Sequence, residues 1–239
     1  MSIKDKIAIV QQQLKQAAIL SGRTQEDIRL IAVSKTKSTE MILQALAAGQ
    51  SAFGENRVQE ALGKIEDLTK LPLVEWHLIG HLQKNKVKFC PGNFQWIHTI
   101  DSTELVKKLE ARSAFAQKKI NVLLQVNLSR EITKSGLHDW EDILQVSETI
   151  LSGKWLKLRG LMTIPPPNIG ETPTRKIYEK LRLWRDKLKQ DLDSPEISEL
   201  SMGMTADFHW AIQEGATMIR VGSAIFGERN EDMDSSTNM

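Results

Sequence analysis

The sequence predicts an α/β fold: a single (β/α)8 TIM barrel that carries an extra helix at its N-terminus. Eight short β-type segments alternate with helical segments from residue 28 onward. Strands that alternate with helices imply parallel strands joined by right-handed crossovers. The 239 residues suit one barrel of this class and leave no room for a second full domain. An open doubly wound sheet is the alternative, but it would have fewer strands and a glycine-rich first turn.

The first twenty residues predict an amphipathic helix on the outside of the barrel. Ser2 can cap the start of this helix and Gly22 can end it. Its apolar residues recur at spacings of four and three: Ile3, Ile7, Val10, Leu14 and Ala17.

The repeating unit after this helix is a strand followed by a helix. The predicted strands are residues 28–34, 51–55, 75–80, 96–100, 121–127, 156–163, 197–203 and 217–223. The helices between them are predicted to begin near Thr39, Val58, Leu82, Thr103, Trp140, Thr174 and Phe208. No shift in composition marks a linker, so residues 1–229 are predicted to form one barrel domain. Residues 230–239 are polar and acidic, and we expect this tail to be disordered.

The composition excludes several classes of protein. Lys plus Arg is 32 against 30 for Asp plus Glu, and the net charge of +2 gives no general attraction to nucleic acid or to an anionic membrane. The single cysteine excludes an intrachain disulfide and a CxxC motif. No segment approaches the roughly eighteen consecutive apolar residues of a membrane span. We therefore expect a cytoplasmic protein that binds no nucleic acid, no membrane and no metal.

Two loops have the residue types of a phosphate site. In a TIM barrel the active site lies at the carboxyl ends of the strands, and phosphates favour the loops after strands seven and eight. Here these loops are residues 201–205 and 220–223, and both contain glycine and hydroxyl side chains. Glycine lets the backbone approach a ligand closely, and backbone N–H groups bind anions. Either loop alone could simply turn the chain and cap the next helix, but the pair favours a phosphate.

Arg220 is predicted to point into the barrel. Strand alternation places Met218, Arg220 and Gly222 on one face of the eighth strand. A buried guanidinium needs a partner. Either a ligand or a carboxylate such as Glu199 or Asp101 could be that partner.

Lys35 directly follows the first strand. It shares a face with Ile31 and Val33, so we expect its amine at the mouth of the barrel. A lysine in a partly desolvated pocket near other cations can act as a nucleophile that forms a Schiff base. A solvated lysine at a strand end is the alternative reading of this position. Asn56 and His77 could face the same mouth.

Six segments of the chain together resemble a known family. They are IAVSKTK, FGENRVQE, WHLIGHLQKNK, GLMTI, SMGMTADFHWAI and IRVGSAIFG. They resemble the pyridoxal phosphate (PLP) homeostasis protein family, whose members are single-domain PLP-binding proteins with the barrel of alanine racemase (fold type III). The resemblance runs from about residue 28 to residue 228.

The resemblance implies a role for each matching residue. Lys35 in VSKT would hold PLP as a Schiff base, and Asn56 in GEN would lie against the cofactor ring. Arg220 would face the pyridine nitrogen. The phosphate would be bound by residues of the last two strand ends: Ser201, Met202, Gly203, Gly222 and Ser223. Thr205 stands where the family more often has serine, which keeps the hydroxyl.

The implied function is that of a carrier or buffer of PLP in vitamin B6 and amino-acid homeostasis. The expected partners are PLP and PLP-dependent apo-enzymes, and the expected state is a monomer. An amino-acid racemase-like enzyme is the alternative, and a PLP-free barrel that binds a phosphorylated metabolite is a third. Alanine racemase uses a tyrosine from a second domain, whereas Tyr178 here lies in a predicted outer helix. We therefore expect no catalytic residue and negligible turnover.

Overall fold

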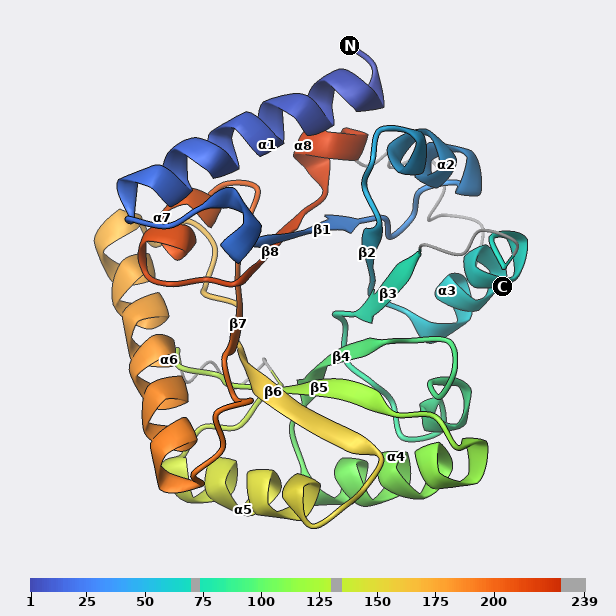
Figure 1. Cartoon of the computed structure of the whole chain (residues 1–239), viewed down its shortest axis with the longest axis vertical. Coiled ribbons are helices and arrows are strands. Elements are labelled where there is room, and N and C mark those ends of the chain that lie inside the picture. Colours follow the sequence, from blue (N-terminus) through green and yellow to red (C-terminus); the bar gives the residue numbers. More distant parts are fainter. Residues whose placement is uncertain (70–73, 130–134, 229–239) are drawn as a thin grey trace.

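The computed structural model describes residues 1–69, 74–129 and 135–228, and it confirms the predicted TIM barrel (Figure 1). Its eight parallel strands close in sequence order, so that β1 pairs with β8. Each predicted strand overlaps one observed strand. The strands are β1 (Arg29–Val33), β2 (Ala52–Glu55), β3 (Glu75–Leu78), β4 (Trp96–Ile100), β5 (Ile120–Gln125), β6 (Leu156–Met162), β7 (Glu199–Met204) and β8 (Met218–Val221). The tail at residues 230–239 lies outside the described residues.

Helices form the outer layer around the strands (Figure 1). The predicted N-terminal helix is confirmed as α1 (Ile3–Leu20), and the hydroxyl of Ser2 caps it by accepting a hydrogen bond from the N–H of Asp5. It lies against α7 (Phe208–Gln213) and α8 (Ser223–Phe226). The remaining α-helices are α2 (Thr39–Ala47), α3 (Val58–Asp67), α4 (Thr103–Ala116), α5 (Trp140–Leu151) and α6 (Glu171–Asp191). None of the helices in the described part of the chain has the length and apolar character needed to cross a membrane.

The core has an outer and an inner part because successive residues of a strand point to opposite sides. On β8, Ile219 and Val221 belong to the large core between strands and helices, whereas Met218 belongs to the small inner core. The inner core consists of Ile31, Ala52, Trp96, Leu123, Met162 and Met218. The predicted alternation of β8 is therefore confirmed.

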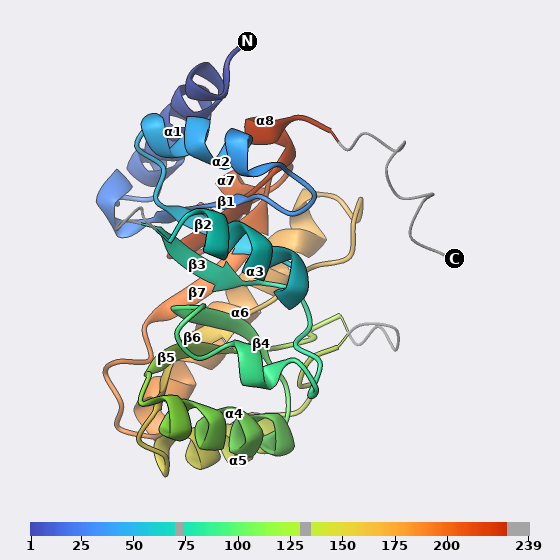
Figure 2. The ribbon, with the colours of Figure 1, turned by 90° about the vertical axis from the view of Figure 1, so that its right-hand side faces the viewer.

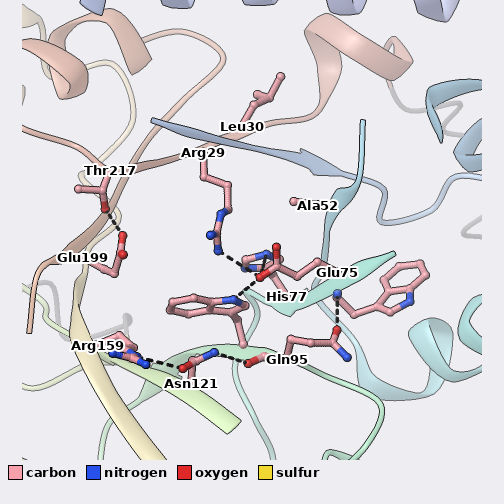
Figure 3. Close-up of polar contacts among 12 residues, drawn as sticks. Arg29, Leu30, Ala52, Glu75, His77, Gln95, Asn121, Arg159, Glu199 and Thr217 are labelled. Atoms are coloured by element: carbon pink, nitrogen blue, oxygen red, sulfur yellow. Dashed lines mark hydrogen bonds and ion pairs between the residues drawn. The ribbon is translucent and has the colours of Figure 1, made fainter. Parts of the chain in front are cut away.

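Polar side chains line the amino-terminal rim of the barrel, where the strands begin (Figure 3). Arg29 Nη1 lies 3.1 Å from Glu75 Oε1, and the indole N–H of Trp96 donates to the same carboxylate. Arg159 Nε donates to Asn121 Oδ1 over 3.0 Å. These contacts join β1, β3 and β4 to one another, and β5 to β6, at the end opposite to the loops that carry the expected site.

Two helical predictions differ from the structure. The helix predicted near Leu82 is wrong: this connection contains only a single 3-10 turn, η2 (Val87–Phe89). Pro91 follows this turn and has no N–H with which to continue a helix, and Gly92 then adopts a φ of 87°. The short helix α8 was not predicted, because one turn is too brief to show a helical period. A second 3-10 turn, η1 (Gln25–Asp27), joins α1 to β1.

Candidate functional site

A cavity of about 450 Å³ opens at the carboxyl ends of the strands. These ends face right in the side view of Figure 2. Five of the eight residues predicted for the site line the cavity: Lys35, Asn56, Arg220, Gly222 and Ser223. We call it the mouth cavity. Its other lining residues include Ile79, Ile164 and Thr205, so apolar side chains alternate with polar groups.

Lys35 reaches the mouth cavity from the loop after β1. The next residue, Thr36, has a φ of 62°, a left-handed conformation that is unfavourable for a β-branched residue. Two hydrogen bonds hold it there: its N–H donates to Glu60 Oε1 over 2.5 Å, and its hydroxyl donates to the carbonyl oxygen of Lys35 over 2.6 Å. The backbone that presents Lys35 is thus held in a strained form by its surroundings.

A buried ionic cluster, here called the Lys64 clamp, fixes the same loop. It consists of Ser34, Glu55, Glu60 and Lys64. Lys64 Nζ lies 2.8 Å from Glu55 Oε1 and 2.7 Å from Glu60 Oε1, and it donates to the carbonyl oxygen of Ser34 over 2.8 Å. The Ser34 hydroxyl donates to Glu55 Oε1 over 2.6 Å. The clamp therefore connects α3 and the end of β2 to the residues on both sides of Lys35.

Burial governs the electrostatics of the Lys64 clamp. Glu55 is fully buried, and desolvation raises the pKa of its carboxyl, while the charge and hydrogen bonds of Lys64 and the hydroxyl of Ser34 oppose that shift. Sequence reasoning missed this cluster. The only local trace of it is the i, i+4 spacing of Glu60 and Lys64 on one helix.

Arg220 is buried, with 4% of its surface exposed, and it lines the base of the mouth cavity. Its Nη1 donates to Ser201 Oγ over 2.5 Å, and its Nη2 donates to the carbonyl oxygen of Thr163 over 2.9 Å. The suggested carboxylate partners are wrong, because Glu199 accepts from Thr217 and Asp101 lies beside His81. No carboxylate in the described ranges forms an ion pair with Arg220.

Burial lowers the pKa of the Arg220 guanidinium, and the nearby Tyr178 and Asp207 oppose this shift. A guanidinium stays protonated in proteins and has donors only. The face that Arg220 turns to the mouth cavity is consequently suited to an acceptor atom of a ligand.

Three predicted residues do not line the mouth cavity: Ser201, Met202 and Gly203. Ser201 and Met202 are fully buried, and the Ser201 hydroxyl is occupied by Arg220. Gly203 has a φ of 92°, and a Cβ there would lie 2.6 Å from the Cβ of Ala211, so glycine lets β7 approach α7 closely. Their predicted contacts with a phosphate stay predictions. Next to them, Thr205 does line the cavity, with its Oγ1 3.3 Å from Ser223 Oγ.

His77 does not reach the mouth. It is fully buried inside the barrel, and its Nδ1 lies 2.9 Å from Nε2 of His98. His98 Nδ1 in turn lies 2.9 Å from Ser201 Oγ. Sequence reasoning assigned nothing to His98, although its position in the middle of β4 places it on the inner face with Trp96.

The chemical groups of the mouth cavity fit PLP. A primary amine on the loop after β1 suits the aldehyde, a guanidinium on the neighbouring β8 suits the ring nitrogen, and hydroxyls with glycine backbone suit the phosphate. Within the described residues, no cluster of His, Cys, Asp and Glu is arranged to hold a metal ion.

Curated proteins resemble this chain over almost its whole length. The family model for the alanine racemase N-terminal domain matches residues 10–230. The pyridoxal phosphate homeostasis protein of Pasteurella multocida is 41% identical over 232 residues, which cover 96% of this chain and 99% of that protein. The protein of the same name in Escherichia coli K12 is 38% identical, and the match covers 95% of this chain and 97% of that protein.

Solved structures give the same relationship. PipY of Synechococcus elongatus PCC7942, solved with PLP bound, superposes with a TM-score of 0.84 at 36% identity, and the match covers 95% of this chain and 100% of PipY. The structure of PipY without PLP superposes with a TM-score of 0.86. Alanine racemase of Clostridium difficile 630 shares the fold, with a TM-score of 0.74 at 16% identity, and 58% of that chain is covered.

Proposed function

Because the chain belongs to the pyridoxal phosphate homeostasis protein family and carries the alanine racemase N-terminal domain, we propose that it binds PLP in the mouth cavity and acts as a carrier or buffer of this cofactor inside the cell. Lys35 holds PLP as a Schiff base. One observation carries this proposal: Lys35, just after β1, and Arg220, on the paired strand β8, line one cavity.

The proposed contacts follow the lining of the cavity. Arg220 donates to the ring nitrogen, and Asn56 lies against the ring. Gly222 and Ser223 bind the phosphate, with Thr205 beside Ser223. Contacts from Ser201, Met202 and Gly203 to the phosphate are proposed through their backbone, because the Ser201 hydroxyl is held by Arg220 and Met202 is buried.

Arg220 supports the role of a carrier over that of an enzyme. PLP supplies an electron sink when its ring nitrogen is protonated, and an arginine at that nitrogen keeps it unprotonated and weakens the sink. Racemisation also needs a second acid or base opposite the lysine. Tyr178 is buried in α6, away from the lining of the cavity. Lys37 lines the cavity too, but its Nζ donates to the carbonyl oxygen of Glu228.

Reduction with borohydride tests the assignment of the lysine. We expect one pyridoxyl group on Lys35 by peptide mass spectrometry, and we expect Lys35→Ala to lose the visible absorbance of the bound cofactor. Lys37→Ala is the matched control, since Lys37 lines the same cavity but is held by Glu228, and it should keep the absorbance. A label on Lys37 in the unmodified protein would refute the assignment.

Incubation with L-alanine in deuterated water tests the absence of turnover. We expect negligible deuterium at the α-carbon, because one general acid or base contributes about 10²–10⁴-fold in rate. The titratable lining residues besides Lys35 and Arg220 are Lys37 and Glu228, and Lys37 is engaged by the carbonyl oxygen of Glu228. Exchange at rates typical of enzymes would favour the racemase-like alternative. We also propose that the protein is a monomer and that it passes PLP to apo-enzymes. Sedimentation of the protein alone measures its oligomeric state, and sedimentation with an apo-enzyme measures whether the two proteins associate.

A further inference from the structure

A row of three hydrogen bonds runs through the interior of the barrel from the mouth cavity to His77, and a longer electrostatic contact extends it to the opposite rim. It begins at Arg220, whose Nη1 donates to Ser201 Oγ. Ser201 Oγ lies 2.9 Å from His98 Nδ1, and His98 Nε2 lies 2.9 Å from His77 Nδ1. His77 Nε2 then lies 3.7 Å from Glu75 Oε1 at the amino-terminal rim, where Figure 3 shows both residues. We call these five residues the axial chain.

The direction of every hydrogen bond in the axial chain follows from Arg220. Arginine can only donate, so Ser201 Oγ accepts from it. The Ser201 hydroxyl is fully buried, and His98 Nδ1 is the acceptor for its proton among the described residues. His98 must therefore be neutral with its proton on Nε2.

The same reasoning extends to the second histidine. Nε2 of His98 donates to Nδ1 of His77, so His77 is also neutral, and its proton lies on Nε2 and faces the carboxylate of Glu75. Each hydrogen bond between Arg220, Ser201, His98 and His77 is thus donated by the residue nearer the mouth cavity, and the last N–H of the row, on His77 Nε2, faces the carboxylate of Glu75.

Packing and electrostatics hold both imidazoles in this state. The His77 ring stacks on Trp96 with 6° between their planes and meets His98 edge-on. Burial lowers the pKa of both histidines. Glu75 and Glu199 act on His77 in the opposite direction, whereas Arg29 adds to the lowering at both rings and Arg220 adds to it at His98.

We propose that His98 is a positioning residue for the cofactor: through Ser201 it fixes Arg220 as a donor aimed at the ring nitrogen. With His98 in place, the Ser201 oxygen presents its lone pair to Arg220 Nη1, and the guanidinium has one orientation. Without His98, the hydroxyl proton of Ser201 lacks this acceptor, and it can turn toward the N–H of Arg220 that donates to the same oxygen. This role rests on the proposed function, whereas the tautomers of the axial chain do not.

The tautomers can be measured on the protein without PLP. Nitrogen-15 NMR of the imidazoles should show His77 and His98 as neutral rings protonated at Nε2, from about pH 5.5 to pH 8. Exposed His209 on α7 provides a comparison signal from outside the barrel interior. An Nδ1-protonated or charged ring at position 98 overturns the proposal, whatever the protein binds.

The positioning role is measured on the protein loaded with PLP labelled with nitrogen-15 in its ring. We expect Ser201→Ala and His98→Phe to move the ring-nitrogen resonance in the same direction, and the double variant to move it no further. His98→Asn keeps an acceptor near the position of Nδ1 and should restore most of the resonance. The control His209→Phe leaves it unchanged.

The affinity for PLP should fall about tenfold in the Ser201→Ala and His98→Phe variants, because each weakens the hydrogen bond that orients the charged Arg220. If His98→Phe does not fold, Ser201→Ala and His98→Asn still test the link. A resonance that moves in Ser201→Ala but not in His98→Phe overturns the role of His98. An unmodified protein that does not take up PLP refutes the proposed function, and the tautomer measurement is unaffected.

Discussion

Arg220 shows how far single residues could be read from the sequence. Alternation along β8 correctly placed its side chain inside the barrel. Its partners could not be read in the same way, because Ser201 and Thr163 come from β7 and from the residue after β6, and their distance depends on the register of three strands. Glu199 and Asp101, the carboxylates considered as partners, contact Thr217 and His81 instead. The side of a strand to which a residue points follows from the local sequence, whereas the residues that it contacts do not.

The two serines of the predicted phosphate site provide a prediction at the residue scale. Ser223→Ala should weaken the binding of PLP by about 1.5–3 kcal/mol and that of pyridoxal much less, because only PLP carries the phosphate. Ser201→Ala should weaken both ligands alike, since the Ser201 hydroxyl contacts Arg220 and His98. Titration of each variant with PLP and with pyridoxal measures this. A Ser201→Ala variant selective against PLP would place its hydroxyl at the phosphate.

Single elements were predictable where their pattern is long. The α1 helix has five full turns of apolar spacing and a serine cap, and the structure places it as expected. The segment after Leu82 has no continuous apolar face at helical spacing, and Pro91 ends it after one 3-10 turn. The Lys64 clamp escaped prediction because the clamp joins β2 and α3 to the loop after β1, and a buried ion pair has no signature in any one element.

The Lys64 clamp carries a prediction at the scale of elements. Lys64→Met keeps the aliphatic stem but leaves Glu55 buried without its cation, so we expect the free energy of unfolding to fall by about 3–5 kcal/mol. Denaturation in urea measures this change. The double variant Lys64→Met/Glu55→Gln should recover part of the loss, because the uncompensated charge is removed.

Lys108→Met is the matched control for this variant. Lys108 also pairs with a glutamate at i, i+4, Glu104, but the pair is exposed on α4, and its loss should leave stability nearly unchanged. A Lys64→Met variant as stable as the control would mean that the clamp does not hold the loop of Lys35.

Closure of the barrel is the property of the whole molecule that creates the site. Lys35 and Arg220 lie near opposite ends of the sequence, and the pairing of β1 with β8 places Ile31 opposite Arg220. The number of predicted strands indicated a closed barrel. Closure of the backbone alone is enough to bring Lys35 and Arg220 close together. It also creates the enclosed interior in which two histidines lie fully buried.

These buried histidines predict how the stability of the whole protein depends on pH. Burial lowers the pKa of His77 and lowers that of His98 well below its ordinary value, whereas in the unfolded chain each takes up a proton near pH 6.5. Below that pH the unfolded state binds more protons than the folded state. Stability should therefore fall as the pH falls from about 6.5 to about 5, by up to about 1.4 kcal/mol per pH unit for each histidine.

Urea denaturation at several values between about pH 5 and pH 7.5 measures this slope, in a range above the ordinary pKa values of carboxyl groups. Burial raises the pKa of Glu55, but this carboxyl is the same in every variant compared. His98→Asn removes one of the two protonation sites, so the slope should drop toward half while the variant still fills most of the space of the imidazole. His209→Asn changes a histidine on the exposed side of α7 and should keep the full slope. A flat profile in the unmodified protein, or an unchanged slope in His98→Asn, would mean that the barrel interior tolerates a charged imidazole. In that case the neutral tautomers on which the axial chain depends would not be fixed by burial.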